Sequence, residues 1–189
     1  GLRGDKDHAP GTFTQYPKAE SRAKALERVK NLDRIIDSAP AVPEPVRVAR
    51  HIHQSVFNIE THSYTDPAST ARRIAQASAL IGRPLRDDGF MSSALQSKFD
   101  GIGSFEVELR LDVPAGTKAL YVSSHRRLPG GKQDPKGLAT YGPEENELVI
   151  GRGVDYEITG VEKAPGSAVE LILYGRIIGQ TPKPLGGGS

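Results

Sequence analysis

Two carboxylates separated by one residue stand directly before an apolar run in residues 144–153. Glu145 and Glu147 flank Asn146, and a Leu-Val-Ile run follows. In a β-strand, side chains two residues apart project from the same face, so the two carboxylates would enter one space. Paired acids on one face can carry out acid–base chemistry and stabilise a developing positive charge. The alternative interpretation is a solvated acidic turn in front of a strand.

The elements that would position these carboxylates begin with helices. Residues 19–38 carry apolar side chains at helical spacing with charged residues between them, which predicts an amphipathic helix. Its apolar positions are Leu26, Val29, Leu32, Ile35 and Ile36. Pro40 lies just beyond the end of this helix and begins a proline-rich connector. A second helix is predicted for residues 68–81, with Gly82 as its C-cap.

Short strands follow the helices. Residues 46–50 alternate, and strict alternation puts Arg50 on the buried face with Val46 and Val48, where an arginine needs a partner, a ligand or a strand end. Six further strands are predicted for residues 90–95, 105–113, 119–123, 148–150, 156–161 and 169–178. Helices followed by short antiparallel strands predict an α+β domain. A polar loop rich in Gly and Pro at residues 126–143 is expected to be either functional or disordered.

The length of 189 residues fits one domain. We expect a flexible N-terminal arm over residues 1–18, a single domain over 19–180 and a Pro/Gly-rich tail or linker over 181–189. The first ten residues are polar and do not resemble a signal peptide.

Composition argues against several classes of function. The net charge is +2 and the basic residues are dispersed, so no direct nucleic-acid partner is expected. There is no apolar run of about 18 residues, so no membrane partner is expected. Cysteine is absent, which fits a reducing compartment or a secreted protein that must unfold and refold. His51, His53 and His62 are close in sequence, but structural or solvated histidines are the favoured interpretation and no metal is expected.

Four features occur in a fixed order along the chain. They are Arg50 at a strand end, the Gly-Phe-Met-Ser-Ser-Ala segment of residues 89–94 after a helix, the long loop, and the Glu-Asn-Glu segment at the start of a strand. Together with the Val-Pro-Ala-Gly-Thr-Lys turn and the later Arg-Gly, this order resembles the arginine–serine–glutamate class of mono-ADP-ribosyltransferases, which includes bacterial exoenzyme toxins. The resemblance runs from about residue 26 to residue 161. It implies N-terminal helices packed on a split β-sandwich, with a central cleft that holds NAD as co-substrate.

The resemblance also implies roles for three residues. Arg50 matches the strand-end arginine that contacts the phosphate and ribose of NAD, and its guanidinium is a planar, permanently charged fork suited to phosphate. Glu147 matches the catalytic glutamate, which stabilises positive charge as nicotinamide leaves. Ser92 matches the first serine of a Ser-Thr-Ser motif and would hold Glu147 in place.

Other positions are expected to recognise the acceptor or nicotinamide. Glu145 matches the position that sorts acceptors in the family, where a glutamate goes with arginine; a second carboxylate can bind a guanidinium, orient it and take its proton. Tyr141, the single aromatic residue of the preceding loop, is the candidate for contact with the target. Phe99 lies where relatives often stack an aromatic ring on nicotinamide, and a packing role is the alternative.

Two departures from the family pattern stand out. The motif reads Ser92-Ser93-Ala94, so Ser93 keeps a hydroxyl while the third serine is absent. His51 follows Arg50 where many relatives have glycine. We expect His51 to offer its backbone to the nicotinamide amide, and both His51 and Ser93 to line the NAD site.

The leading hypothesis is therefore an enzyme that moves ADP-ribose from NAD to an arginine of a target protein. One alternative is an NAD glycohydrolase, in which water replaces arginine. An alternative of another class is a non-catalytic NAD-binding or structural module of a phage or toxin protein. We expect the protein to be secreted or delivered into a target cell and to act in its cytoplasm, and a delivery or immunity partner is left open.

Overall fold

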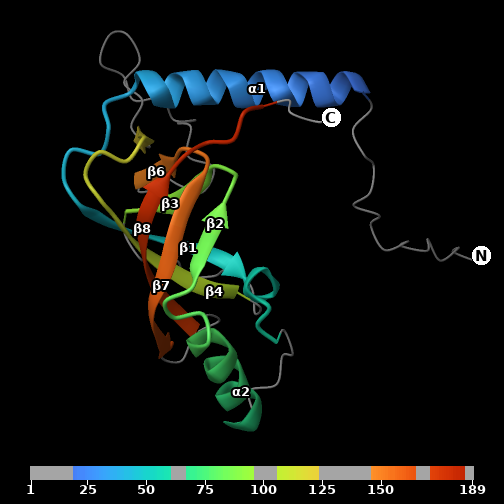
Figure 1. Cartoon of the computed structure of the whole chain (residues 1–189), viewed down its shortest axis with the longest axis vertical. Coiled ribbons are helices and arrows are strands. Elements are labelled where there is room, and N and C mark those ends of the chain that lie inside the picture. The colour runs from blue at the N-terminus through green and yellow to red at the C-terminus, as the bar shows by residue number, and fades with distance from the viewer. Residues whose placement is uncertain (1–18, 61–66, 96–105, 124–145, 165–170, 186–189) are drawn as a thin grey trace, which may run out of the picture.

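The computed structural model describes residues 19–60, 67–95, 106–123, 146–164 and 171–185 (Figure 1). The elements are α1 Ala19–Ser38, β1 Val46–His53, the 3-10 helix η1 Gln54–Phe57, α2 Pro67–Ser78, β2 Pro84–Asp87, β3 Met91–Ala94, β4 Glu106–Val113, β5 Ala119–Ser123, β6 Asn146–Ile150, β7 Val154–Lys163 and β8 Leu171–Gln180. The predicted α+β class is confirmed. The predicted arm and the predicted long loop lie outside the described residues.

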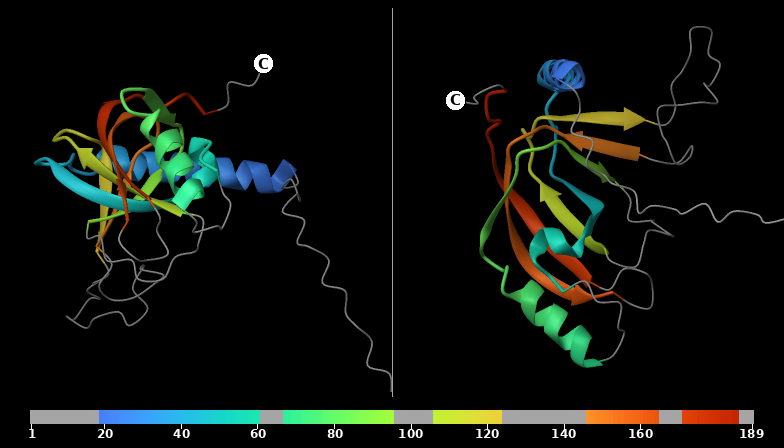
Figure 2. Two further views of the ribbon diagram at one scale, coloured as in Figure 1. Left: turned by 90° about the horizontal axis from the view of Figure 1, so that it is seen from below. Right: turned by 90° about the vertical axis from the view of Figure 1, so that its right-hand side faces the viewer.

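The eight strands form one sheet that is nearly divided in two. Their order is β2-β7-β8-β4-β1-β3-β6-β5, and the β4–β8 pairing is parallel. β1 pairs with β4 along its whole length but with β3 through one residue pair, Ala49 and Ala94. A five-stranded part, β2 to β1, therefore meets a three-stranded part, β3-β6-β5, at a narrow junction. Figure 2 shows β5 and β6 running across the direction of β7 and β8, which agrees with the predicted split sandwich.

The hydrophobic core lies between the two parts of the sheet. Leu109, Leu111 and Leu173 from the five-stranded part are 0% exposed, as are Met91 and Ile150 from the three-stranded part. Alternation explains which side chains face inward on most of these strands; β8 is the exception, because Ile172 beside Leu173 is also buried. Residues of both parts of the sheet thus pack in one hydrophobic core.

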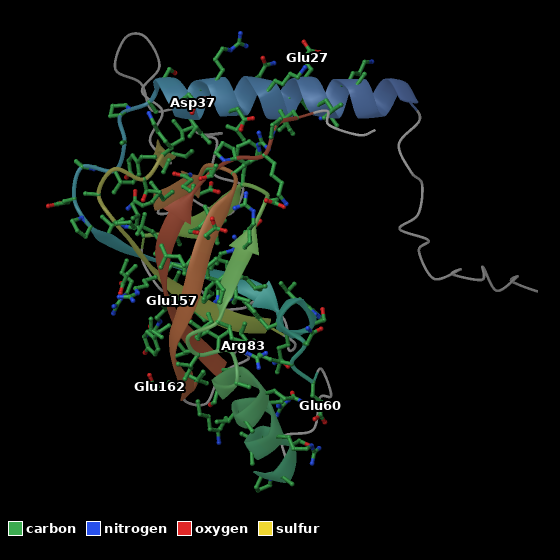
Figure 3. The ribbon with its side chains drawn as sticks, in the orientation of Figure 1. Glu27, Asp37, Glu60, Arg83, Glu157 and Glu162 are labelled. Carbon is green, nitrogen blue, oxygen red and sulfur yellow. The ribbon has the colours of Figure 1, made fainter. Side chains whose placement is uncertain are left out.

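Helix α1 crosses one end of the sheet and α2 lies at the other end (Figure 1). Ile36 of α1 is 2% exposed. Asp33 of α1 accepts hydrogen bonds from Arg152 at 2.9 and 2.6 Å, and the Arg152 guanidinium also lies 5.9 Å from the Phe90 ring centroid. Glu27 projects from the side of α1 that faces away from the sheet (Figure 3). The ion pair, the buried Ile36 side chain and a 3.3 Å hydrogen bond from Lys118 Nζ to the Asp37 carbonyl therefore hold α1 in place.

The predicted boundaries hold closely for most elements. The helix predicted for residues 19–38 coincides with α1, whereas α2 ends at Ser78 rather than residue 81. Gly82 has a φ of 76°, but it lies four residues beyond the end of α2 and its N–H donates to the carbonyl of Ile158 on β7, so the predicted C-cap role is wrong. β1 continues to His53, beyond the predicted end at residue 50. Neither described helix combines the length and apolarity of a membrane span.

Candidate active site

Strands β3 and β6 bring Ser92 and Glu147 together. Ser92 lies opposite Val149, and Glu147 is two residues from Val149 on the same face. Ser92 and Glu147 are thus diagonal neighbours on paired strands, and the Ser92 Oγ donates a hydrogen bond to Glu147 Oε1. This is the contact that the sequence led us to expect between these residues.

Glu147 is held on both sides and still open to a ligand. β6 lies between β3 and β5, so Glu147 pairs with Ala94 on one side and Val122 on the other. The preceding residue, Asn146, accepts a hydrogen bond of 2.7 Å from the Tyr121 hydroxyl, which fixes the start of β6. Ser92 is exposed and Glu147 is partly exposed. A carboxylate on a central strand with a bonded partner is a preorganised group.

Arg50 borders the narrow junction from the other part of the sheet. It follows Ala49, the residue of β1 that pairs with β3. Alternation turns its side chain to the inner side of β1, opposite Leu109, whereas Ala49 shares the side of Ala94 and Glu147. Within the described residues, no hydrogen bond joins Arg50 to Ser92 or Glu147. The structure therefore brings Arg50 to the edge of the split but does not bond it to the other two side chains.

The inward Arg50 side chain has an ionic partner that the sequence did not reveal. Its Nη1 lies 3.4 Å from Asp87 Oδ2, and the two side chains are 20% and 32% exposed. Asp87 ends β2, a strand that was not predicted. The expectation that an arginine on this face needs a partner is met. The identity of that partner had no sequence signal, because 37 residues separate the two positions.

His51 is buried beside an acid. Its side chain is 4% exposed and its Nε2 lies 3.6 Å from Glu108 Oε2, directly across β1 and β4. The other oxygen of Glu108 accepts a hydrogen bond of 2.5 Å from Arg110. Because the imidazole is covered, a ligand in the split would meet the backbone of His51. That backbone role stays a prediction.

Two further polar side chains, one on β3 and one in η1, are buried without a hydrogen-bond partner in the described part of the chain. They are the Ser93 hydroxyl and both amide atoms of Gln54, and the two residues are 3% and 1% exposed. Buried polar groups of this kind are rare and are satisfied by water or a ligand. Ser93 was a predicted NAD contact. The burial of Gln54 was not predicted, since a lone glutamine after a strand gives no sequence signal of burial.

The remaining predicted site residues lie outside the described residues. These are Phe99, Tyr141 and Glu145, and their roles stay predictions. Among the residues that the structure describes, no group of three His, Asp or Glu side chains is arranged to hold a metal ion.

Replacing Ser92 by alanine tests the bond between the two strands. We expect Ser92→Ala to lower kcat/KM for nicotinamide release from NAD by about fivefold to tenfold, since one hydrogen bond contributes about 1 kcal/mol. The Glu147 carboxylate would remain but would be less well oriented. Steady-state kinetics with HPLC detection of nicotinamide measure this effect. Unchanged kinetics would place Ser92 outside the site.

The sequence and the fold are similar to those of known proteins. A family model described as ADP-ribosyltransferase exoenzyme matches residues 10–174, which include β1, β3 and β6. The "Epidermal cell differentiation inhibitor" of Staphylococcus aureus is 35% identical over 80 residues, which are 42% of this chain and 27% of the relative. The chain thus spans about a quarter of the length of that curated relative.

Solved structures share the fold at low identity. C3larvin toxin, an ADP-ribosyltransferase from Paenibacillus larvae, matches with a TM-score of 0.57 and 15% identity over 82% of this chain and 72% of that chain. C3stau2 from S. aureus, with NAD, matches with a TM-score of 0.57 and 23% identity over 80% and 70%. The ADP-ribosylating toxin BECa of C. perfringens, with NADH, matches with a TM-score of 0.64 and 19% identity over 91% of this chain and 38% of that chain. Since the family model covers most of the chain, and with it both parts of the split sheet, the chain belongs to the ADP-ribosyltransferase exoenzyme family.

Proposed function

We propose that this chain transfers ADP-ribose from NAD to an arginine side chain of a target protein and releases nicotinamide. The observation that carries the proposal is the hydrogen bond from Ser92 to Glu147, which fixes a carboxylate on β6, the central strand of the three-stranded part. Family membership supports NAD as the co-substrate, as do the similar structures that hold NAD or NADH.

The carboxylate of Glu147 suits the bond-breaking step. NAD supplies the ADP-ribosyl group, with nicotinamide as the leaving group. The bond between the ribose carbon and the nicotinamide nitrogen breaks, and its electron pair leaves with nicotinamide. Positive charge therefore develops on the ribose. A fixed carboxylate stabilises that charge without reorganisation at the moment of reaction. Ser92 keeps the carboxylate in place through the paired strands β3 and β6.

Arg50 suits the binding of the diphosphate. Its backbone directly follows Ala49, the junction residue of β1, and its inward side chain is 20% exposed. Arginine keeps its charge at any physiological pH and can present two parallel donors to phosphate oxygens. We assign Arg50 to NAD binding and Glu147 to bond breaking.

Support for arginine as the acceptor comes from the sequence. Glu145 precedes Glu147 by two residues. A carboxylate there would bind the acceptor guanidinium, whose nitrogen forms the new bond to the ribose carbon and gives up a proton. We further propose that the protein is secreted or delivered into a target cell and meets its target protein in the cytoplasm.

Labelled NAD and agmatine, a free guanidine acceptor, test the proposal. We expect both free nicotinamide and ADP-ribosyl-agmatine to form. Nicotinamide without the adduct would indicate an NAD glycohydrolase or a transferase that accepts only a protein. If neither product forms, the result would favour a non-catalytic NAD-binding module and overturn the proposal.

Glu145→Gln separates the acceptor from the bond-breaking step. We expect at least about a tenfold loss of transfer to agmatine, because glutamine lacks the negative charge that pairs with the guanidinium and cannot take its proton. Nicotinamide release without acceptor should fall much less. The same reaction, run with and without agmatine, measures both rates. Equal loss of both rates would show that Glu145 does not act on the acceptor.

A further inference from the structure

Arg50 carries a charge on the inner side of the sheet, where a charge needs compensation. Its neighbours on that side of β1 include Val48, which is 1% exposed, and its cross-strand partner Leu109 is 0% exposed. The Arg50 Nε is buried and has no hydrogen-bond partner in the described part of the chain. A buried guanidinium without a counter-charge is strongly destabilising. Asp87 is the acid that faces it.

Asp87 reaches Arg50 across the interior and not along the sheet. β2, which carries Asp87, and β1, which carries Arg50, are the two outermost strands of the five-stranded part. The ring of Tyr156 on β7 lies beside the pair: burial raises the pKa of Tyr156 to about 12, the charge of Asp87 adds to this, and the charge of Arg50 opposes it. The ion pair therefore spans the open end of the sandwich.

The Asp87 carboxylate is itself held in place by the backbone. Its Oδ1 accepts a hydrogen bond of 2.8 Å from the N–H of Gly89, in the short turn between β2 and β3. β3 then carries Ser92, which bonds Glu147. One carboxylate thus connects the arginine of the five-stranded part with the turn that leads into the strand of the catalytic pair.

We propose that Asp87 is the positioning residue for Arg50 in NAD binding, an inference that rests on the proposed function. Asp87 contacts Nη1 alone, at 3.4 Å, which is long for a hydrogen bond. The contact supplies a counter-charge and a fixed direction. It leaves Nη2 for a phosphate oxygen, because guanidinium has five donors in a rigid fork. Asp87 itself touches no substrate.

A carboxylate near a phosphate site can also have the opposite effect, and this makes the sign of the result decisive. If Asp87 competed with the diphosphate for Arg50, its neutralisation would tighten NAD binding. If Asp87 orients Arg50, its neutralisation weakens binding. The two models therefore predict changes in opposite directions for the same variant.

Asp87→Asn is the informative substitution. Asparagine keeps the shape and an oxygen that can accept the Gly89 N–H, but it removes the charge that faces Arg50. We expect the dissociation constant for NAD, measured by calorimetry, to rise about tenfold, in line with loss of a contact between charged groups. KM for NAD should rise in parallel while kcat changes little, because the contact serves binding. Asp87→Glu should restore part of the affinity.

Asp88→Asn is the matched control. Asp88 is the next residue, but its partners are Arg86 and Lys183, both at 2.6 Å, and none of these three residues lies in the proposed site. The NAD affinity of the Asp88→Asn variant should equal that of the wild type. A fall in melting temperature of either variant measures any purely structural effect.

The Arg50→Ala background separates positioning from a general effect on the fold. If Asp87 acts through Arg50, Asp87→Asn should cause no further loss of NAD affinity once Arg50 is removed. The inference would be overturned by additive losses in the double variant, by tighter NAD binding of Asp87→Asn, or by unchanged binding. In each of these cases, nicotinamide release by the wild-type protein would leave the proposed function standing. A wild type that neither binds NAD nor releases nicotinamide would overturn both.

Discussion

Glu147→Gln is expected to lower nicotinamide release from NAD about a thousandfold, with or without an acceptor, which is the scale observed when a preorganised electrostatic group is removed from a site. Glutamine has nearly the same shape and can still accept the hydrogen bond from Ser92. The strand pairing around residue 147 should therefore persist, and only the negative charge is lost. NAD affinity should change little, because the charge matters most as the ribose becomes positive.

The matched control for this variant is Glu157→Gln. Glu157 lies on β7, accepts a 2.6 Å hydrogen bond from Arg176, and is remote from β3 and β6 in the strand order (Figure 3). The Glu157→Gln variant should release nicotinamide at the wild-type rate. Rates are compared at saturating NAD by HPLC. Near-normal release by Glu147→Gln would remove Glu147 from the catalytic site.

Gly153→Ala is expected to lower the free energy of unfolding by about 3 kcal/mol, the sum of a left-handed backbone penalty and local overpacking. Gly153 has a φ of 75°, and a Cβ there would lie 2.3 Å from the carbonyl oxygen of Thr181. The neighbouring chain cannot move away easily, because the Thr181 N–H donates a 2.7 Å hydrogen bond to Gly153. Urea unfolding followed by circular dichroism measures the loss.

Gly116→Ala separates the two contributions. Gly116 has a φ of 87°, but a Cβ there would meet no atom within 4 Å. This variant should lose only about 1–2 kcal/mol, from the backbone conformation alone. At about 2–4 °C per kcal/mol for a chain of this size, the two variants should differ in melting temperature by several degrees. Equal losses would show that the close approach of Thr181 does not restrict residue 153.

Elements with a repeated local pattern were predictable from the sequence. β4 alternates over eight residues, so burial of one face defines it without reference to the rest of the chain. α1 was predictable from the helical spacing of its apolar residues, although Ile36 is buried while Leu26 and Ile35 are exposed. β2 was missed because its four residues include Pro84 and two charges and it pairs on one side only. Its stability comes from distant contacts such as the 2.9 Å ion pair between Arg86 and Asp155. No window of sequence around β2 contains that partner.

The candidate site was also predictable only in part. The pairing of Ser92 with Glu147 followed from a family pattern that preserves the order of the motifs, and the structure places the two side chains in contact. The alternation in β1 predicted an inward Arg50 in need of a partner. Asp87 could not be identified, since an acid before a Gly-Phe pair is unremarkable until β2 is placed opposite β1 across the interior.

The strand order has a consequence for how this protein folds. Among the described strands, only β5–β6 and β7–β8 are sheet neighbours that also follow one another in the chain. Pairs such as Val107 with Leu171 must close long loops. Topologies with such a high contact order fold slowly, because chain entropy is lost before the distant contacts form. Until Ala49 meets Ala94, Arg50 and the Ser92–Glu147 pair belong to separate pieces of sheet. Regain of activity after denaturation is therefore expected to lag behind regain of helical signal and to report the completed fold.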